Sequence, residues 1–100
     1  MGISTNMRAI DTIKSEILSE VAKLHRTLAE CDEINGYDDV SDEIATIIAM
    51  DYILARRLGI GHGAVDAKIN ELLSIAIDNN HELELEFSDM SELRKHISKR

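Results

Sequence analysis

VSDEIATIIAMDYILARRL, the sequence of residues 40–58, decides the fold of this chain. Between Ile44 and Ala55 every residue except Thr46 and Asp51 is apolar. A helix that is apolar on all sides has to be covered on all sides. We therefore expect a central helix with other elements packed against each of its faces.

Asp51 interrupts this apolar stretch. At about 100° per residue it falls in the middle of one stripe of the helix. That stripe consists of Val40, Ile44, Ile47, Leu54 and Leu58. A carboxylate in such a place requires a partner, a metal or a proton. Two interpretations stay open: a metal ligand or catalytic acid, or a structural acid paired with a basic side chain or a backbone N–H.

The composition indicates a small all-α protein. One hundred residues suffice for one domain, residues 1–100, and the absence of proline favours helices. The net charge of −8 argues against general affinity for nucleic acid or anionic membranes, and is compatible with divalent cations or basic proteins. The single cysteine, Cys31, excludes an internal disulfide and favours a reducing cytoplasm. No apolar run approaches the ~18 residues of a membrane helix.

The segment before the central helix predicts a long amphipathic helix. Its apolar stripe consists of Ile10, Ile13, Ile17, Val21, Leu24 and Leu28. Ser4, Thr5 or Asn6 is suited to cap its start. A helix of roughly 25 residues is roughly 38 Å long, against a radius of gyration of about 13 Å for such a chain. We therefore expect a second copy beside it, in a homo-oligomer that is a dimer or a tetramer.

Turn signals divide the rest of the chain. Asn35-Gly36 predicts the link of a helical hairpin, and Gly59 is placed to end the central helix. A third helix is expected to end near Asn79-Asn80. Its stripe consists of Val65, Ile69, Leu72 and Ala76.

The last part of the chain predicts short elements. Residues 81–87 read HELELEF, and we expect an irregular or helical segment there, because a lone strand has no partner. Asp89 with Glu92 has the spacing of a capping box for a short C-terminal helix. The expected fold is therefore a helical hairpin, a third helix and a short last helix.

The block DEIATIIAMDYILARRLGIGHGAVDAKIN, residues 42–70, resembles the second half of the MazG-type all-α nucleotide pyrophosphohydrolases. In that family a helix beginning E-x-x-D leads through a Leu-Gly-hydrophobic joint to a helix bearing K-x-N. Glu43 takes the first of these positions, and Lys68 and Asn70 take the last two. The whole chain also resembles stand-alone MazG-like proteins. The resemblance implies a bundle whose acidic residues hold Mg²⁺, which binds a triphosphate and activates water.

Three metal-ligand positions depart from that pattern. Where the family carries E-E-x-x-E, this chain has Ser19 first and Lys23 last, and Thr46 replaces the Asp of E-x-x-D. The remaining carboxylates are Glu20 and Glu43. Mg²⁺ prefers near-octahedral oxygen ligands, usually with more than one carboxylate. The ammonium of Lys23, one turn from Glu20, opposes such a cation, and a Lys–Glu pair could replace it.

We therefore expect an impaired pyrophosphohydrolase, in which Mg²⁺ binds weakly or not at all. Asp51, two turns beyond Glu43, is the candidate replacement ligand. Lys68 and Asn70 are the candidate nucleotide-binding residues, and a nucleotide or a protein is the expected partner.

Two other classes of function stay open. One is a non-catalytic helical interaction module. The other is a helix-turn-helix DNA-binding protein, for which Ala55, Gly59 and Val65 have the characteristic spacing. Against DNA binding stand the length of the central helix, a following helix without the Arg that reads guanine, and the negative charge.

Overall fold

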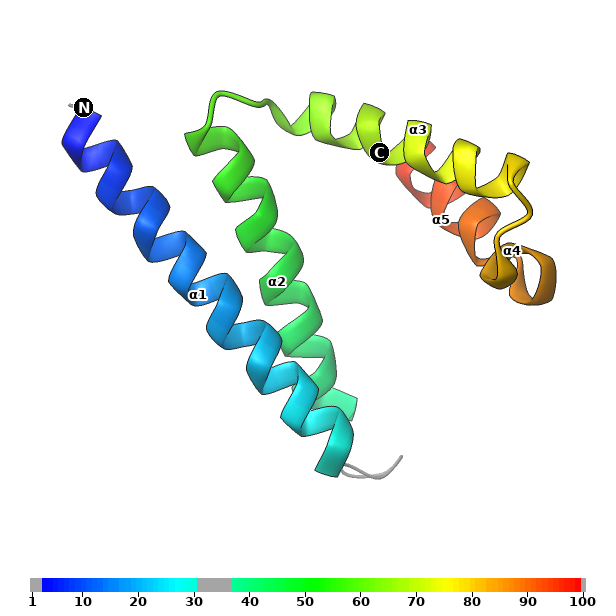
Figure 1. The fold of residues 1–100 in the computed structure, drawn as a ribbon, viewed down its shortest axis with the longest axis horizontal. Coiled ribbons are helices and arrows are strands. Elements are labelled where there is room, and N and C mark those ends of the chain that lie inside the picture. Colours follow the sequence, from blue (N-terminus) through cyan, green and yellow to red (C-terminus); the bar gives the residue numbers. More distant parts are fainter. Residues whose placement is uncertain (1–2, 31–36, 100) are drawn as a thin grey trace. The chain divides into compact units, whose positions relative to one another are not determined.

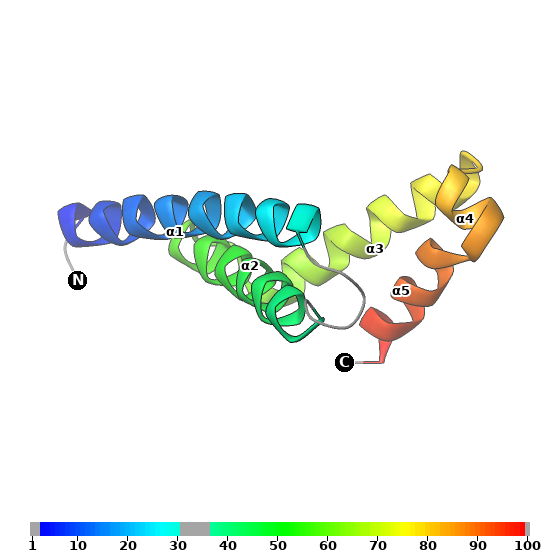
Figure 2. The same ribbon diagram turned by 90° about the horizontal axis from the view of Figure 1, so that it is seen from below.

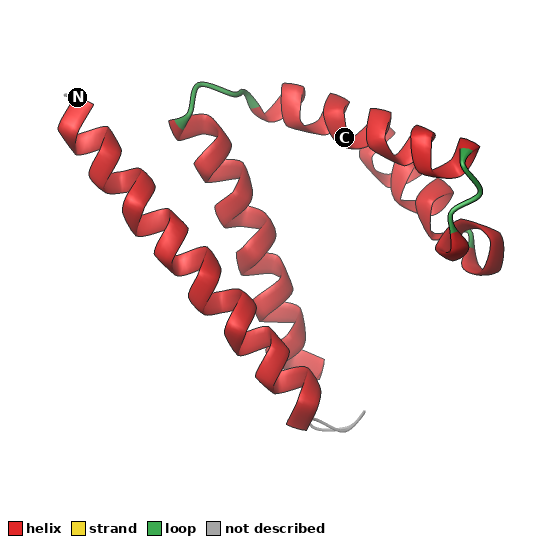
Figure 3. Ribbon diagram, in the orientation of Figure 1, coloured by secondary structure: helices red, strands yellow, loops and turns green. Residues whose placement is uncertain are grey.

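The computed structural model describes residues 3–30 and 37–99, and within these ranges all regular structure is α-helical (Figure 3). The helices are α1 (Ile3–Glu30), α2 (Tyr37–Arg57), α3 (His62–Asp78), α4 (Glu82–Phe87) and α5 (Asp89–Ser98). The predicted all-α class is confirmed. None of these helices is long and apolar enough to cross a membrane. Cys31 and the expected Asn35-Gly36 turn lie outside the described residues.

The chain divides into two compact units, Met1–Ile60 and Gly61–Arg100. The first unit holds α1 and α2, and the second holds α3, α4 and α5. Each unit is described by itself below. That residues 1–100 act as one domain stays a prediction.

The first unit is a hairpin in which α1 and α2 lie side by side and antiparallel (Figures 1 and 2). The residues between the two helices are spaced alternately by three and four positions, as in an antiparallel coiled coil. We call this contact the seam. Its buried and half-buried residues include Asn6, Ile10, Ile13, Ile17, Glu20, Leu24 and Thr27 on α1, and Val40, Glu43, Ile47, Met50, Leu54 and Arg57 on α2.

The predicted stripe of α1 agrees with the seam over its first half and differs afterwards. Ile13 is buried, but Val21 and Leu28 are 45% and 57% exposed. Glu20 and Thr27 take their places in the seam. A seam that repeats every seven residues is narrower than the apolar surface of α1, so one flank of that surface stays outside it.

The sequence predicts that neighbouring elements cover α2 on every face, and among the described residues of its own unit this is wrong. Ile44, Ile48 and Ile53 are 44%, 49% and 44% exposed, because α1 is the only helix packed against α2 within this unit. The packed stripe of α2 centres on Glu43, about 60° around the helix from the predicted centre. Asp51 is consequently exposed rather than enclosed in the packed stripe.

The end of α2 has a Schellman motif. Ile60 N–H donates to the Ala55 carbonyl at 2.8 Å, and Gly59 N–H donates to the Arg56 carbonyl at 3.1 Å. Gly59 has φ +87°, a conformation that glycine adopts without steric cost, so its predicted role is confirmed. Ser4, Thr5 or Asn6 was expected to cap α1, but all three lie inside that helix, which begins at Ile3. The Asn6 amide donates to the Arg57 carbonyl at 3.1 Å.

The second unit is built on the packing of α3 against α5 (Figure 2). Leu73 and Ile97 are its buried apolar residues among those described. Leu73 takes the central place expected for Leu72, which is 57% exposed. The predicted end of α3 is confirmed, since Asn80 has φ +57° and His81 N–H donates to the Ala76 carbonyl. Residues 82–87 form the helix α4, where an irregular or a helical segment was expected.

Glu84 of α4 caps α5. Its carboxylate accepts a hydrogen bond from Ser91 N–H at 2.9 Å and a second one from the Ser91 hydroxyl. These two hydrogen bonds lower the pKa of Glu84. The expected capping box of Asp89 and Glu92 is wrong: α5 begins at Asp89, after Ser88, whose side chain makes no capping bond.

We predict that Glu84→Gln lowers the Tm of the chain at neutral pH by several degrees. A lowered pKa in the folded state contributes stability above the usual carboxyl pKa of 4.5, and this contribution is lost as the pH falls through the lowered value. The Tm difference between wild type and Glu84→Gln should therefore shrink in acid. Glu86→Gln, an exposed position on the same helix, is the matched control for thermal melts followed by circular dichroism. A Tm difference that is independent of pH would contradict the assignment.

Candidate functional site

A pocket of about 250 Å³ opens on one side of the hairpin seam. Its lining consists of Ser15, Glu16, Ser19, Glu20 and Thr46. Ser19 and Thr46 are two of the positions at which the chain departs from the metal-binding pattern. The structure thus brings these two positions together with Glu20, although Thr46 comes from the opposite helix.

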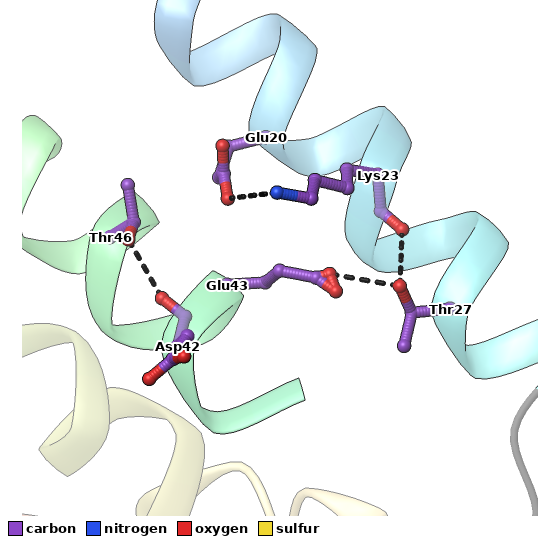
Figure 4. Close-up of polar contacts among 6 residues, drawn as sticks. All are labelled: Glu20, Lys23, Thr27, Asp42, Glu43 and Thr46. Carbon is purple, nitrogen blue, oxygen red and sulfur yellow. Dashed lines mark hydrogen bonds and ion pairs between the residues drawn. The ribbon is translucent and has the colours of Figure 1, made fainter. Parts of the chain in front are cut away.

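Glu43 lies deep in the seam and is only 2% exposed. Figure 4 shows its side chain extending from α2 toward Thr27 of α1. The Glu43 Oε2 atom lies 2.9 Å from the Thr27 hydroxyl, whereas Oε1 is buried and has no hydrogen-bond partner among the described residues. Such a half-satisfied buried carboxyl group is costly, so the Thr27 hydroxyl matters for stability.

The Thr27 hydroxyl has two acceptors within reach. Besides Glu43 it contacts the Lys23 carbonyl, one turn back on α1, at 3.0 Å (Figure 4). A hydroxyl carries a single hydrogen, so it donates to only one of these acceptors at a time. The bond to Glu43 therefore competes with a local bond along α1.

Lys23 and Glu20 form the charged part of the site. The Lys23 ammonium lies 3.9 Å from Glu20 Oε1, and the two side chains are 61% and 22% exposed. As the sequence predicts, Glu20 and Glu43 both lie between α1 and α2, and neither points away from the hairpin (Figure 4). Their role as metal ligands stays a prediction.

The pocket lining has two carboxylates, Glu16 and Glu20, and is poorer in carboxylates than the resembled family pattern. The described residues include no group of three or more His, Cys, Asp or Glu side chains that could hold a metal ion. The Thr46 hydroxyl donates to the Asp42 carbonyl of its own helix at 2.7 Å. Lys23 already supplies a positive charge to Glu20. The site thus offers an internal ammonium where a divalent cation needs further oxygen ligands.

The remaining sequence candidates lie elsewhere. Asp51 is exposed on α2, outside the pocket lining. Lys68 and Asn70 belong to α3 of the second unit. The Lys68 ammonium lies 3.0 Å from Glu71 Oε2, and both side chains are about 60% exposed. Asn70 is half-buried, and its Oδ1 atom is buried with no hydrogen-bond partner within residues 3–30 and 37–99.

Sequence reasoning missed Thr27. The available signal was its spacing, three residues after Leu24 and seven after Glu20, which places it in the seam once the seven-residue repeat is recognised. Glu16 and Ser15, which complete the pocket lining, gave no such signal because both are exposed on α1.

The family model that describes the MazG-like family matches residues 3–90. The chain belongs to the MazG-like family. The match extends over α1, α2, α3 and α4 and reaches the start of α5, so it spans both the hairpin site and the helix with Lys68 and Asn70. Neither a search of curated proteins nor one of solved structures gives a match. The α2 of this MazG-like chain, at 21 residues, is also longer than the short first helix of a helix-turn-helix motif.

We predict that Thr27→Val lowers the free energy of unfolding by about 1–3 kcal/mol, because it removes the donor to a buried carboxyl group. Thr27→Val combined with Glu43→Leu should recover most of this loss, since both polar partners are then gone. Urea denaturation measures both effects, and Thr12→Val, at an exposed position of the same helix, is the matched control. If Thr27→Val is as neutral as the control, the hydrogen bond is not structural.

Proposed function

We propose that this MazG-like protein has lost ordinary metal-dependent nucleotide pyrophosphohydrolase activity and retains nucleotide binding. The observation that carries the proposal is the pocket itself. Ser19 and Thr46 line it beside Glu20, and hydroxyl groups replace carboxylates at both positions. The site keeps its place in the hairpin while its metal ligands are depleted.

The electrostatics support this loss. The Lys23 ammonium lies 3.9 Å from the carboxylate of Glu20, so a divalent cation at Glu20 would approach against its positive charge. The other seam carboxyl group, Glu43, is directed to Thr27 and is absent from the pocket lining. Asp51, the proposed replacement ligand, lies outside the pocket lining, and it belongs to no group of three or more His, Cys, Asp or Glu side chains among the described residues.

Nucleotide binding is proposed to use Lys68 and Asn70. In the described part of the chain, the ammonium of Lys68 pairs with the exposed Glu71, a weak interaction that a phosphate group could replace. Asn70 carries a buried acceptor that lacks a donor. The exposed ammonium of Lys68 is the group proposed to contact a phosphate. The buried acceptor of Asn70, about 200° away around the helix, would need a donor instead.

A reducing cytoplasm is the proposed location.

A non-catalytic interaction module is the second candidate. The observation in its favour is the number of large apolar side chains that stay exposed on the hairpin. A homo-oligomer, dimer or tetramer, is proposed for either function, because α1, at 28 residues, is about 42 Å long and has only α2 beside it within its unit.

We predict that wild-type protein releases no pyrophosphate from common nucleoside triphosphates above background, and that its Tm does not respond to Mg²⁺. The variant Ser19→Glu/Lys23→Glu/Thr46→Asp should bind Mg²⁺ at least about tenfold more tightly, because it adds three carboxylates and removes the ammonium. Isothermal titration and thermal shift measure this. Lys95→Glu on α5, which repeats the charge change of the Lys23→Glu substitution alone, is the control. Robust Mg²⁺-dependent pyrophosphate release by the wild type would overturn the proposal.

Nucleotide binding is tested separately by isothermal titration with nucleoside triphosphates without metal. We expect saturable heat for the wild type and about tenfold weaker binding for Lys68→Ala, since a charge-assisted phosphate contact is lost. Lys95→Ala is the matched control. Absence of heat and of thermal shift in the wild type favours the interaction module.

A further inference from the structure

The short helix α4 carries exposed apolar side chains at the end of the second unit, where α3 ends and α5 begins (Figure 1). Leu83, Leu85 and Phe87 are 42%, 70% and 59% exposed, and Phe87 is the single phenylalanine of the sequence. At about 100° per residue, these three side chains and the exposed acids Glu82 and Glu86 occupy one arc of about 200° around the helix. We call this arc the α4 face. Large apolar and aromatic side chains that are exposed together usually mark a binding surface.

Two capping contacts hold α4 in place. At its start the His81 side chain accepts a hydrogen bond from Leu83 N–H at 3.0 Å. Near its middle Glu84, about 160° around the helix from the centre of the α4 face, accepts the hydrogen bonds from Ser91 of α5. A helix of six residues is unstable by itself, so these contacts are needed to keep it folded. The α4 face is thus presented on a fixed element, which lowers the entropic cost of binding a partner.

The acidic residues around the α4 face are not explained by folding. Residues 69–93 contain no Lys or Arg. Asp78, Glu82, Glu86 and Asp89 are all exposed, and none of them forms an ion pair within the described part of the chain. Asp78 and Glu86 lie in the last turns of α3 and α4, where the helix dipole disfavours negative charge and where neither helix has a basic residue. A positively charged partner would relieve both unfavourable placements.

We propose that the α4 face docks a basic segment of another protein that also carries apolar side chains. Its apolar side chains cover Leu83, Leu85 and Phe87, and its Lys or Arg side chains pair with Glu82 and Glu86. Charge selects this occupant, because a second copy of this chain has the same net charge of −8 and an anionic surface is repelled. The inference goes beyond the proposed nucleotide binding and does not depend on it.

The probe for this surface is a fluorescent synthetic peptide of leucine and lysine whose leucines lie on one face of a helix. Fluorescence anisotropy should show saturable binding that weakens as the salt concentration rises, since the charges are exposed. A shuffled peptide of the same composition, which lacks an apolar face, should bind at least about tenfold more weakly. In amide NMR spectra, the shifts caused by the peptide should be concentrated at residues 82–90, which span α4 and the start of α5.

Two pairs of matched variants test the apolar and the charged contacts. Leu85→Ser should weaken binding at least about tenfold, whereas Leu18→Ser, at a position of α1 that is 72% exposed, should leave it unchanged. Glu82→Gln/Glu86→Gln should weaken binding about tenfold and reduce its salt dependence. Asp11→Asn/Glu30→Gln removes the same charge from exposed positions of α1 and should change binding less than about twofold.

Circular dichroism establishes that each variant keeps its helices. If Leu85→Ser fails to fold, the charge variants, whose substitutions keep the size of each side chain, test the proposal by themselves. An absence of peptide binding by the wild type overturns the proposal. Equal losses in the α1 and α4 variants overturn it as well, because they indicate unspecific attraction to an acidic chain.

The same spectra distinguish another occupant. Shifts at residues 82–90 that depend on protein concentration without peptide, and that Leu85→Ser abolishes, would identify a second copy as the occupant and overturn the proposed partner. Nucleotide binding is measured with Lys68→Ala, which changes α3 and leaves the α4 face intact. Failure of either proposal is therefore distinguishable from failure of the other.

Discussion

The hydrogen bond between Thr27 and the buried carboxyl group of Glu43 is the interaction on which the hairpin depends. An acid that is 98% removed from solvent constrains its neighbours, since it tolerates few other arrangements of the two helices. The bond joins α1 and α2 in one register. With Glu43 at the centre of the packed stripe, the pocket opens on one side of the seam and apolar residues remain on the other.

This division assigns separate roles to the two sides of one hairpin. The polar side carries the pocket, where hydroxyl groups and the Lys23–Glu20 pair stand at positions that hold carboxylates in the resembled family pattern. The other side carries exposed apolar residues, among them Val21, Ile44 and Ile48. The exposed apolar surface of the hairpin favours association, whatever the pocket on the polar side binds.

The second unit is stabilised by different means. Its core among the described residues is small, with Leu73 and Ile97 buried, and short-range hydrogen bonds between α4 and α5 add to it. Glu84 reaches from α4 to the first turn of α5 and satisfies Ser91 N–H, which has no partner inside its own helix. The hydrogen bonds from Ser91 are also the main cause of the lowered pKa of Glu84. Lys68 and Asn70 thus lie on α3 of a unit in which the Glu84 carboxylate links α4 to α5 by hydrogen bonds to Ser91.

Local patterns in the sequence determined the helices and several of their ends. Apolar periodicity predicted α1, α2 and α3, and Gly59 and Asn80 stop two of them because each adopts positive φ. The family resemblance identified Ser19, Glu20 and Thr46 as related positions, and the hairpin brings them to one pocket. Only the tertiary structure decided which flank of each helix enters the seam. Both helices have more apolar surface than one neighbour can cover, so several rotations satisfy the pattern equally. Packing selected the rotation that buries Glu43 against Thr27 and leaves Asp51 exposed, and no local preference distinguishes these alternatives.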